Sequence, residues 1–502
     1  MILNVEGTSH RYYVETLCMI FFPGSHFSEN EKPGESVPEI SLTVSREGDK
    51  VTAAAQMKLM GKQARGIGEA KPDEEIKDPE RIEKIAIGRA VFAAGKDLLG
   101  YTNPWGILTG VRPAKVANEL LSQGTGVLKA KRILRDEYFL NPKKAALAVI
   151  VAVTENKLVK KLPKGLCSVY ISIPFCPSRC AYCSFISCSV ERLFTVLKDY
   201  LVRLHQDIDR VFEVIRRQGL KVATVYIGGG TPTTLSDEEL EALLSHITRK
   251  AAPEDLLEFT LEAGRPDTIT RGKLAIARKY GVTRISVNPQ TLNQNVLNAI
   301  GRRHTVEQFF EAYHLAEQSG IPNLNVDLIA GLPGDDFSSF AYSVDRVLEL
   351  SPSNITVHTF CVKKAADIEK NGVYSITGGD VAKCVEYSQL RAKATGYKPY
   401  YMYRQKNTVG NQENVGFAKE GTEGYYNVFM MEEMHTVFAV GAGAVTKLVR
   451  DGLNGKREIK RIFAPKYPYE YLRDNEKLWN GDGTKLSFAG QVEAFFTGGK
   501  EN

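Results

Sequence analysis

Hydrophobic residues alternate with polar ones in two stretches near the start of the chain. One is Ile-Ser-Leu-Thr-Val-Ser at residues 40–45, and the other runs from Val51 to Leu59. A period of two predicts strands with one buried face. Between about Ile82 and Lys160 the apolar spacing becomes three to four residues, which predicts helices. The clearest shared helix face is formed by Ile87, Ala90, Val91, Ala94 and Leu98.

The pattern of hydrophobic residues changes after a basic, proline-containing stretch at residues 157–164, which we take as a linker. Six short β-branched runs predict strands at Ser168–Ile173, Thr224–Ile227, Glu258–Leu261, Arg284–Val287, Asn325–Ile329 and Ile355–Thr359. Helical patterns separate them, among them Asp199–Arg217, Asp237–Lys250, Val306–Ser319 and Ser338–Leu350. Strands alternating with helices predict an α/β fold with a parallel sheet and right-handed crossovers. In such folds the chemistry lies at the carboxyl ends of the strands.

The pattern becomes less regular from about Tyr397, where Tyr, Gly and Asn are frequent. We therefore expect three parts. They are an N-terminal α+β domain (1–160), an α/β core (161–396) and a C-terminal cap or substrate region (397–502).

Composition narrows the class of protein. The 502 residues are 43% hydrophobic and 25% charged, as in a soluble globular protein. No basic stretch followed by a long apolar segment begins at Met1, and the longest apolar run, Ala145–Val153, is too short to span a bilayer. We expect a cytoplasmic location and no membrane span. The net charge of +6 is spread thinly, which does not indicate nucleic-acid binding.

Five of the eight cysteines cluster in one segment: Cys167, Cys176, Cys180, Cys183 and Cys188. In a cytosolic chain such clustering indicates a metal or iron–sulfur site. The spacing of Cys176, Cys180 and Cys183, just after the first predicted strand, fits a loop around one corner of a [4Fe–4S] cluster. Such a cluster normally takes four cysteines, so three leave one iron open. A zinc site is the alternative, but the spacing lacks the paired Cys-x-x-Cys of zinc ribbons.

The segments Tyr170-Ile-Ser-Ile-Pro-Phe-Cys176 and Cys180-Ala-Tyr-Cys183-Ser-Phe resemble the radical S-adenosylmethionine (SAM) superfamily, and more narrowly its coproporphyrinogen-oxidase-like branch. The resemblance implies a partial (β/α)6 TIM-type barrel with a [4Fe–4S] cluster on Cys176, Cys180 and Cys183. In that superfamily SAM chelates the open iron, and reduction of the cluster cleaves SAM to methionine and a 5′-deoxyadenosyl radical.

The same resemblance implies a SAM site at the later strand ends. Its expected members are Tyr170, Tyr182, Gly228, Gly229, Gly230, Thr231, Glu262, Gln290, Arg302 and Asp327. Glycines allow close approach to a ligand, and the Glu262 carboxylate can accept hydrogen bonds from ribose hydroxyls. The planar guanidinium of Arg302 matches the SAM carboxylate, with Arg303 as second candidate. The alternatives are a tight turn at the glycines, a solvated Glu262, and plain packing of the two tyrosines.

Residues 105–113 and 400–414 resemble one subgroup, the HemZ-type oxygen-independent coproporphyrinogen III oxidases, or coproporphyrinogen dehydrogenases. The resemblance implies coproporphyrinogen III or a related tetrapyrrole as substrate, protoporphyrinogen IX as product, and an electron donor such as flavodoxin or ferredoxin. An anionic macrocycle needs an apolar cavity with cations at its rim. The candidate cations, for which ordinary surface charge is the alternative, are Arg404 first, then Arg265, Lys363, Lys364 and Lys406.

Two positions depart from typical oxidases of the branch, which carry His where this chain has Ser172 and a fourth cysteine where it has Phe185. Cys188 lies at a different spacing, and we expect it not to be a ligand, because the open iron must stay free for SAM. Two other functions stay open. A haem chaperone would carry His-Asn-x-x-Tyr-Trp where this chain reads Tyr426-Asn-Val-Phe-Met-Met. A methyltransferase that opens haem anaerobically is the other.

We predict that Cys176→Ala leaves the fold largely intact but removes the cluster and all SAM cleavage, because one of three thiolate ligands is lost. Iron content and 5′-deoxyadenosine formation measure this. Full SAM cleavage by the variant would contradict the ligand assignment.

Overall fold

The computed structural model describes residues 1–23, 25–27, 34–160, 162–183, 188–361, 378–405, 408–452 and 457–498. The chain forms two compact units. The first consists of Met1–Asn156 with Met402–Glu413, and the second of Lys157–Tyr401 with Asn414–Asn502. The chain first passes from one unit to the other between Asn156 and Lys157, where the expected linker begins. That residues 397–502 act as a cap stays a prediction.

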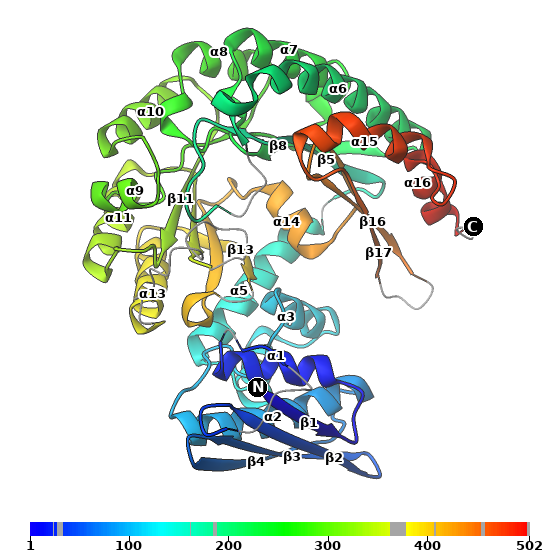
Figure 1. Ribbon diagram of the computed structural model, residues 1–502, viewed down its shortest axis with the longest axis vertical. Helices are drawn as coiled ribbons and strands as arrows, with labels where there is room; N and C mark the ends of the chain where they lie inside the picture. Colours follow the sequence, from blue (N-terminus) through cyan, green and yellow to red (C-terminus); the bar gives the residue numbers. More distant parts are fainter. Residues whose placement is uncertain are drawn as a thin grey trace. The chain divides into compact units, whose positions relative to one another are not determined.

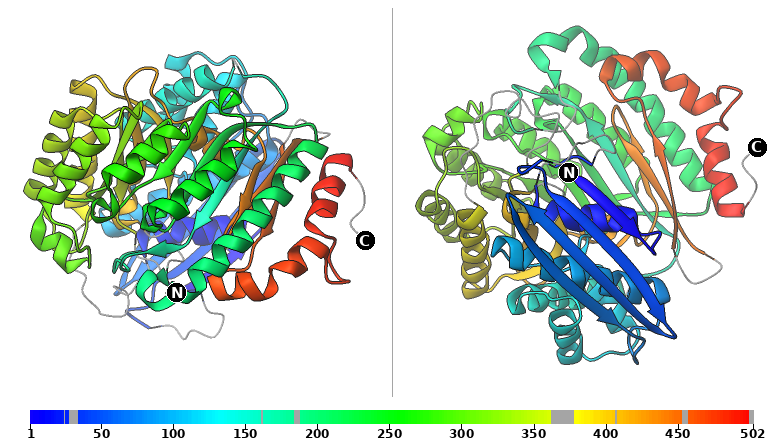
Figure 2. Two further views of the ribbon diagram at one scale, coloured as in Figure 1. Left: turned by 90° about the horizontal axis from the view of Figure 1, so that it is seen from above. Right: turned by 60° about the horizontal axis from the view of Figure 1, so that its bottom comes forward.

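The first unit contains a four-stranded sheet in the order β1-β2-β3-β4 (Figures 1 and 2). Its strands are β1 (Ile2–Glu6), β2 (Glu39–Glu47), β3 (Lys50–Leu59) and β4 (Lys62–Ala70). Strand β1 runs parallel to β2, and the other pairs are antiparallel. The predicted alternation is confirmed, because Ile40, Leu42 and Val44 are buried while Ser41 and Thr43 are exposed.

Helices complete the first unit: α1 (Arg11–Phe21), α2 (Pro79–Leu99), α3 (Pro113–Ser122), α4 (Val127–Asp136) and most of α5 (Pro142–Val159). Helix α2 packs on β3 and β4. The contact requires glycine in β4, since a Cβ on Gly66 would lie 2.1 Å from the Ala90 carbonyl oxygen. The predicted apolar face of α2 is buried from Ile87 to Ala94, and Leu98 is half-buried.

A buried ion pair joins the returning segment 402–413 to the rest of the first unit. Lys144 Nζ lies 2.6 Å from Glu413 Oε1, and both side chains are at most 3% exposed. Trp105 Nε1 donates to the second carboxylate oxygen at 2.8 Å. Burial would raise the pKa of Glu413, but the Lys144 charge and these hydrogen bonds hold it below its usual value.

Arg404 belongs to the same assembly. Its guanidinium lies 5.7 Å from the centre of the Trp105 ring, and its Nη1 donates to the Leu108 carbonyl at 2.6 Å. Its backbone amide donates to the Val111 carbonyl at 2.7 Å. Burial lowers the pKa of Arg404 to about 10. These contacts join residues 105–113 to segment 400–414, the two segments on which the subgroup resemblance is based. The buried Nε of Arg404 has no hydrogen-bond partner among the described residues, and the expected role of this arginine toward substrate stays a prediction.

The second unit contains an eleven-stranded sheet in the order β13-β14-β12-β11-β10-β9-β8-β5-β15-β16-β17. Its six middle strands are the predicted ones, and they are all parallel to one another. They are β5 (Leu166–Ile173), β8 (Lys221–Gly229), β9 (Glu258–Glu262), β10 (Arg284–Ser286), β11 (Asn323–Ala330) and β12 (Asn354–Thr359). The expected parallel α/β core is thereby confirmed.

The pattern did not predict the strands that extend this sheet at both edges. They are β13 (Lys398–Arg404), β14 (Glu413–Ala418), β15 (Val437–Val440), β16 (Val445–Asp451) and β17 (Arg457–Phe463). Strand β15 adds parallel to β5, whereas β14 adds antiparallel to β12. The C-terminal segment therefore builds both flanks of the sheet. A further short pair joins β6 (Phe175–Cys176) to β7 (Cys188–Ser189).

Helices cover the outer side of the sheet in the second unit (Figure 1). They are α6 (Val190–Arg217), α7 (Asp237–Thr248), α8 (Arg271–Lys279), α9 (Gln294–Ala299), α10 (Val306–Gln318), α11 (Phe337–Leu350) and α13 (Gly378–Ala394). This unit also contains the short 3-10 turns η1 (Pro232–Thr234), η2 (Pro253–Asp255) and η3 (Pro266–Thr268) and the helices α14 (Tyr425–Glu432), α15 (Pro468–Asn480) and α16 (Phe488–Thr497). The turn η4 (Val409–Asn411) belongs to the first unit. Among the described residues, no helix is both long and apolar enough to cross a membrane.

We predict that Lys144→Met lowers the free energy of unfolding by about 3–5 kcal/mol, because it leaves the Glu413 carboxylate buried without its partner. Chemical denaturation measures the loss. The double variant Lys144→Met/Glu413→Leu should recover much of it. Lys157→Met, which breaks a solvent-exposed pair with Glu420, should have a far smaller effect. Equal losses for Lys144→Met and Lys157→Met would contradict this account.

Candidate functional site

Cys176 is the last residue of β6, and Cys180 and Cys183 lie in the loop that follows it. Cys180 is buried, and Cys176 and Cys183 are partly exposed. The loop is fixed by its backbone, since Ala181 N donates to the Ile300 carbonyl at 2.9 Å and Cys183 N to the Cys180 carbonyl at 3.0 Å. The Cys176 sulfur lies 3.4 Å from Thr231 Oγ1. One short loop thus presents three thiols beside the end of β8.

The described residues contain no group of three His, Cys, Asp or Glu side chains arranged to hold a single metal ion. In an iron–sulfur site each thiolate binds a different iron, so the sulfurs need not converge on one point.

The glycine motif turns the chain sharply at the end of β8. Gly229 has a φ of +103°, which favours glycine. A Cβ on Gly230 would lie 2.5 Å from the Phe175 carbonyl oxygen, so only glycine allows the turn to lie against β6. Thr231 N donates to that same carbonyl at 2.7 Å. The motif therefore joins the turn after β8 directly to the cysteine loop.

Glu262, the last residue of β9, lies in a half-buried polar cluster. The Tyr226 hydroxyl donates to its carboxylate. Burial raises the pKa of Glu262 to about 7, and the nearby Asp327 charge adds to the rise while Tyr226 and His358 oppose it. Gly228 makes room for this pair, because a Cβ there would lie within 3.0 Å of both side chains.

Asp327 on β11 is the fixed anion of the cluster. It accepts hydrogen bonds from Asn325 Nδ2 at 2.8 Å and Asn288 Nδ2 at 2.9 Å, and His358 Nε2 lies 3.6 Å away. Burial would raise the pKa of Asp327, but these partners, His358 foremost, hold it below its usual value. Sequence reasoning missed His358. Its only signal was its place near the end of the predicted strand 355–359.

Gln290 and Arg302 each hold a buried polar atom that no described residue satisfies, namely Oε1 of Gln290 and Nε of Arg302. Gln290 also adopts a φ of +69°, an uncommon value for a residue with a side chain. The other Arg302 nitrogens donate to the carbonyls of Asn288 and Gly264, both at 2.7 Å. Strain and unsatisfied polar atoms at strand ends are typical of a ligand site.

Three tyrosines stack on the inner side of the sheet. The Tyr226 and Tyr426 rings lie 4.4 Å apart, and the Tyr170 ring lies 6.0 Å from Tyr226. Tyr182 lies instead in the cysteine loop, where its hydroxyl contacts Cys180. Burial chiefly raises its pKa, while Arg302 opposes the rise. The structure thus separates the two expected tyrosines: Tyr170 lies in the stack and Tyr182 in the cysteine loop.

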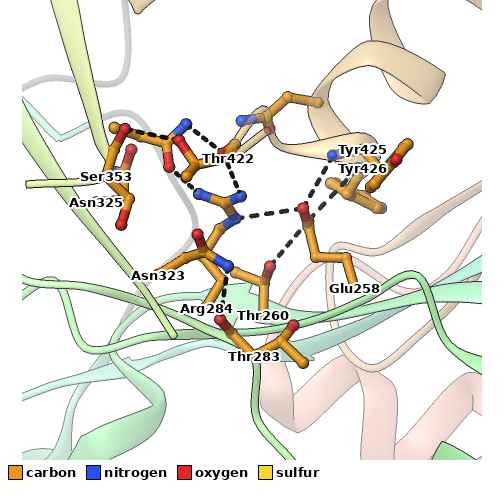
Figure 3. A network of polar contacts seen from close by, with 12 residues as sticks. Glu258, Thr260, Thr283, Arg284, Asn323, Asn325, Ser353, Thr422, Tyr425 and Tyr426 are labelled. Atoms are coloured by element: carbon orange, nitrogen blue, oxygen red, sulfur yellow. Dashed lines mark hydrogen bonds and ion pairs between the residues drawn. The ribbon is translucent and has the colours of Figure 1, made fainter. Parts of the chain in front are cut away.

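Helix α14 carries Tyr426 and is capped by a distant side chain. The helix begins at a glycine and has no side-chain cap of its own. Instead, the Glu258 carboxylate accepts a hydrogen bond from Tyr425 N at 2.9 Å and another from Tyr426 N at 3.4 Å (Figure 3). A carboxylate stabilises a helix N-terminus because it meets unpaired N–H groups and the positive end of the dipole.

Arg284 fixes this cap in place. Its Nε donates to Glu258 Oε2 at 3.2 Å, its Nη2 donates to the Thr422 carbonyl at 2.7 Å, and its Nη1 donates to Asn354 (Figure 3). The network joins the first residues of β9, β10 and β12 to the segment before α14. It therefore holds Tyr426 against Tyr226, which in turn contacts Glu262.

Not every predicted cation lies at this site. Arg265 is buried beside the cysteine loop, where it contacts Ser178, Cys180 and Asp267. Lys363, Lys364 and Lys406, like Phe185, lie outside the described residues. Arg404 ends β13. The other expected site residues lie in the carboxyl-terminal halves of β5, β8, β9 and β11, in β6, or in the segments that follow β6, β8 and β10.

Comparison with known proteins agrees with this arrangement. Residues 170–347 match the family model described as the radical SAM superfamily. Among solved structures, coproporphyrinogen III oxidase (HemN) from Escherichia coli, a radical SAM enzyme, shares the fold. The TM-score is 0.51 at 20% identity, over 65% of this chain and 72% of that one. The fold and the site thus define a radical SAM protein.

Similar proteins of known sequence identify the family within this superfamily more closely. The chain is 36% identical over 493 residues to the oxygen-independent coproporphyrinogen-III oxidase-like protein HemZ of Bacillus subtilis, which covers 97% of this chain and 95% of that protein. It is also 31% identical over 283 residues to the heme chaperone HemW of B. subtilis, over 55% of this chain and 70% of that one. The chain therefore belongs to the HemZ-like family of coproporphyrinogen-III oxidase-like proteins within the radical SAM superfamily. Its cofactors are accordingly a [4Fe–4S] cluster and SAM.

We predict that Glu262 makes the protein less stable as the pH rises from about 4.5 to 7. In this range the unfolded chain releases the Glu262 proton while the folded protein, with a pKa of about 7, keeps it. Glu262→Gln should therefore gain stability relative to the wild type across this window and keep a constant gain above it. Thermal unfolding at several pH values measures the difference.

Tyr226→Phe provides the matched control. It removes the hydrogen bond that lowers the pKa of Glu262, so the upper end of the window should move to higher pH. In the double variant with Glu262→Gln, this effect of Tyr226→Phe on the pH profile should disappear. A wild-type profile identical to that of Glu262→Gln would contradict the assignment.

Proposed function

We propose that this protein catalyses the oxygen-independent oxidative decarboxylation of coproporphyrinogen III to protoporphyrinogen IX. Each of two propionate side chains loses a hydrogen atom, carbon dioxide and one electron, and a vinyl group remains. The observation that carries the proposal is the likeness to HemZ over 97% of the chain, which includes the segments 105–113 and 400–414.

The residues at the strand ends fit the two cofactors. Cys176, Cys180 and Cys183 hold the cluster and leave one iron for SAM. The unsatisfied atoms of Gln290 and Arg302 fit a polar ligand beside them. With one electron from a donor such as flavodoxin or ferredoxin, the cluster and SAM supply a 5′-deoxyadenosyl radical.

The protein's own residues would bind and orient SAM. The turn of Gly228, Gly229, Gly230 and Thr231 would bind the amino group, and Arg302 would supply positive charge for the carboxylate. Ionised Glu262 would accept hydrogen bonds from the ribose, and Asp327 would bind toward the adenosyl end. Tyr170 and Tyr182 stay sequence-based candidates for cofactor contact. Because Arg302 and Asp327 are already held by hydrogen bonds, binding would need little reorganisation of these two groups.

The carboxylates of the substrate need cationic partners. Arg265 and Arg404 direct their hydrogen bonds to the protein itself. Lys363, Lys364 and Lys406 stay sequence-based candidates for this role.

A haem chaperone is the second candidate, favoured by the 31% identity to HemW over part of the chain. Against it, the position of the chaperone histidine is occupied by Tyr426, whose ring is packed against Tyr226 and Tyr170. Chaperone activity would need stable stoichiometric haem binding without turnover. A haem-opening methyltransferase would instead release a methylated tetrapyrrole.

The deciding assay gives reconstituted protein SAM, a reductant and coproporphyrinogen III under anaerobic conditions. We expect 5′-deoxyadenosine and protoporphyrinogen IX from the wild type and neither from Cys176→Ala. Absence of both products from fully reconstituted wild type would refute the oxidase. Titration with haem, followed by its absorption, tests the chaperone in the same preparation.

A further inference from the structure

Arg265 is a buried arginine whose donors are divided between an acid and the cysteine loop. Its side chain is 3% exposed, and the residue lies three positions after the end of β9. Nε and Nη2 donate to the two carboxylate oxygens of Asp267, each at 3.0 Å. Nη1 points the other way, to Ser178 Oγ at 3.1 Å and to the Cys180 sulfur at 3.9 Å. The guanidinium therefore spans from Asp267 to an expected cluster ligand.

We infer that Arg265 is a positioning residue for the cluster, which donates an N–H to the Cys180 thiolate and raises the reduction potential of the cluster. The inference rests on the proposed assignment of Cys180 as a ligand. It goes beyond that assignment, because it names a residue of this chain that sets how readily the cluster accepts its electron.

The physical argument follows from charge. One-electron reduction adds one negative charge to the cluster and its thiolates. A hydrogen bond to a ligand sulfur and a nearby cation both stabilise that added charge. Arg265 is electrostatically coupled to Cys176 as well as to Cys180. Because the guanidinium is buried, solvent screens the interaction weakly.

Asp267 acts in the opposite sense. Its carboxylate forms a bidentate pair with Arg265, which orients the guanidinium and neutralises part of its charge. Removing Asp267 should therefore leave a stronger net positive charge beside Cys180. Two neighbouring residues thus predict shifts of opposite sign.

A purely structural role would give another result. Arg265 also donates to the Ser178 carbonyl at 3.3 Å and could serve only to hold the loop. Loss of such a role would lower the amount of cluster assembled without moving the potential of the clusters that form. The potential and the occupancy separate the two roles.

The test is a redox titration of the reconstituted holoprotein without SAM or substrate, followed by the electron paramagnetic resonance signal of the reduced cluster. Arg265→Gln should make reduction at least tenfold less favourable, a shift of about 59 mV to more negative potential for one electron. Asp267→Asn should shift the midpoint to more positive potential. Arg271→Gln, at an exposed arginine six residues further on, should leave it unchanged.

An unchanged midpoint in Arg265→Gln with full cluster content would overturn the inference. If that variant fails to assemble a cluster, Arg265→Lys takes its place. It keeps the charge but loses the planar fork, and it should fall between wild type and the expected Gln value. If neither assembles, Asp267→Asn decides, and a midpoint equal to or below wild type overturns the inference. Since no substrate is present, these outcomes do not depend on whether coproporphyrinogen is converted.

Discussion

Parallel pairing of the six middle strands is the constraint on which the site depends. Parallel strands joined by right-handed crossovers must all end at one edge of the sheet. Residues from separate βα units, such as Thr231, Glu262 and Asp327, therefore lie toward the same edge of the sheet, and Thr231 contacts Cys176 there. The flanking strands contributed by the C-terminal segment extend this sheet on both sides without changing the direction of the six.

A charged side chain is costly to bury without a partner. In the second unit, residues from several strands provide these partners. Glu258 and Arg284 neutralise each other at the starts of β9 and β10, and their remaining hydrogen bonds fix α14. At the opposite ends of the strands, Asp327 is surrounded by donors, whereas Glu262 is left with a raised pKa. The contrast fits a structural network at one end and a ligand site at the other, since perturbed pKa values concentrate where function requires them.

In the first unit, a buried ion pair holds together segments that are far apart in the chain. The Lys144–Glu413 pair, with Trp105 and Arg404 around it, joins segments far apart in the chain. A buried pair of this kind adds little net stability over an apolar core, but breaking it is expensive. It therefore favours one arrangement of segment 402–413 over others. This explains why the distinctive residues of two separate sequence motifs are found in a single assembly.

The sequence by itself determined the features that depend on local spacing. Short β-branched runs predicted the six core strands. Alternation and helical periodicity predicted the N-terminal strands and the face of α2, because side-chain direction repeats every two or 3.6 residues. Cysteine spacing indicated the cluster loop in the same way. Only the tertiary structure decided which distant groups meet: His358 beside Asp327, Glu258 at the start of α14, and Arg265 at Cys180. No periodicity encodes such contacts, because they arise from the order of strands in the sheet and from the need of each buried charge for a partner.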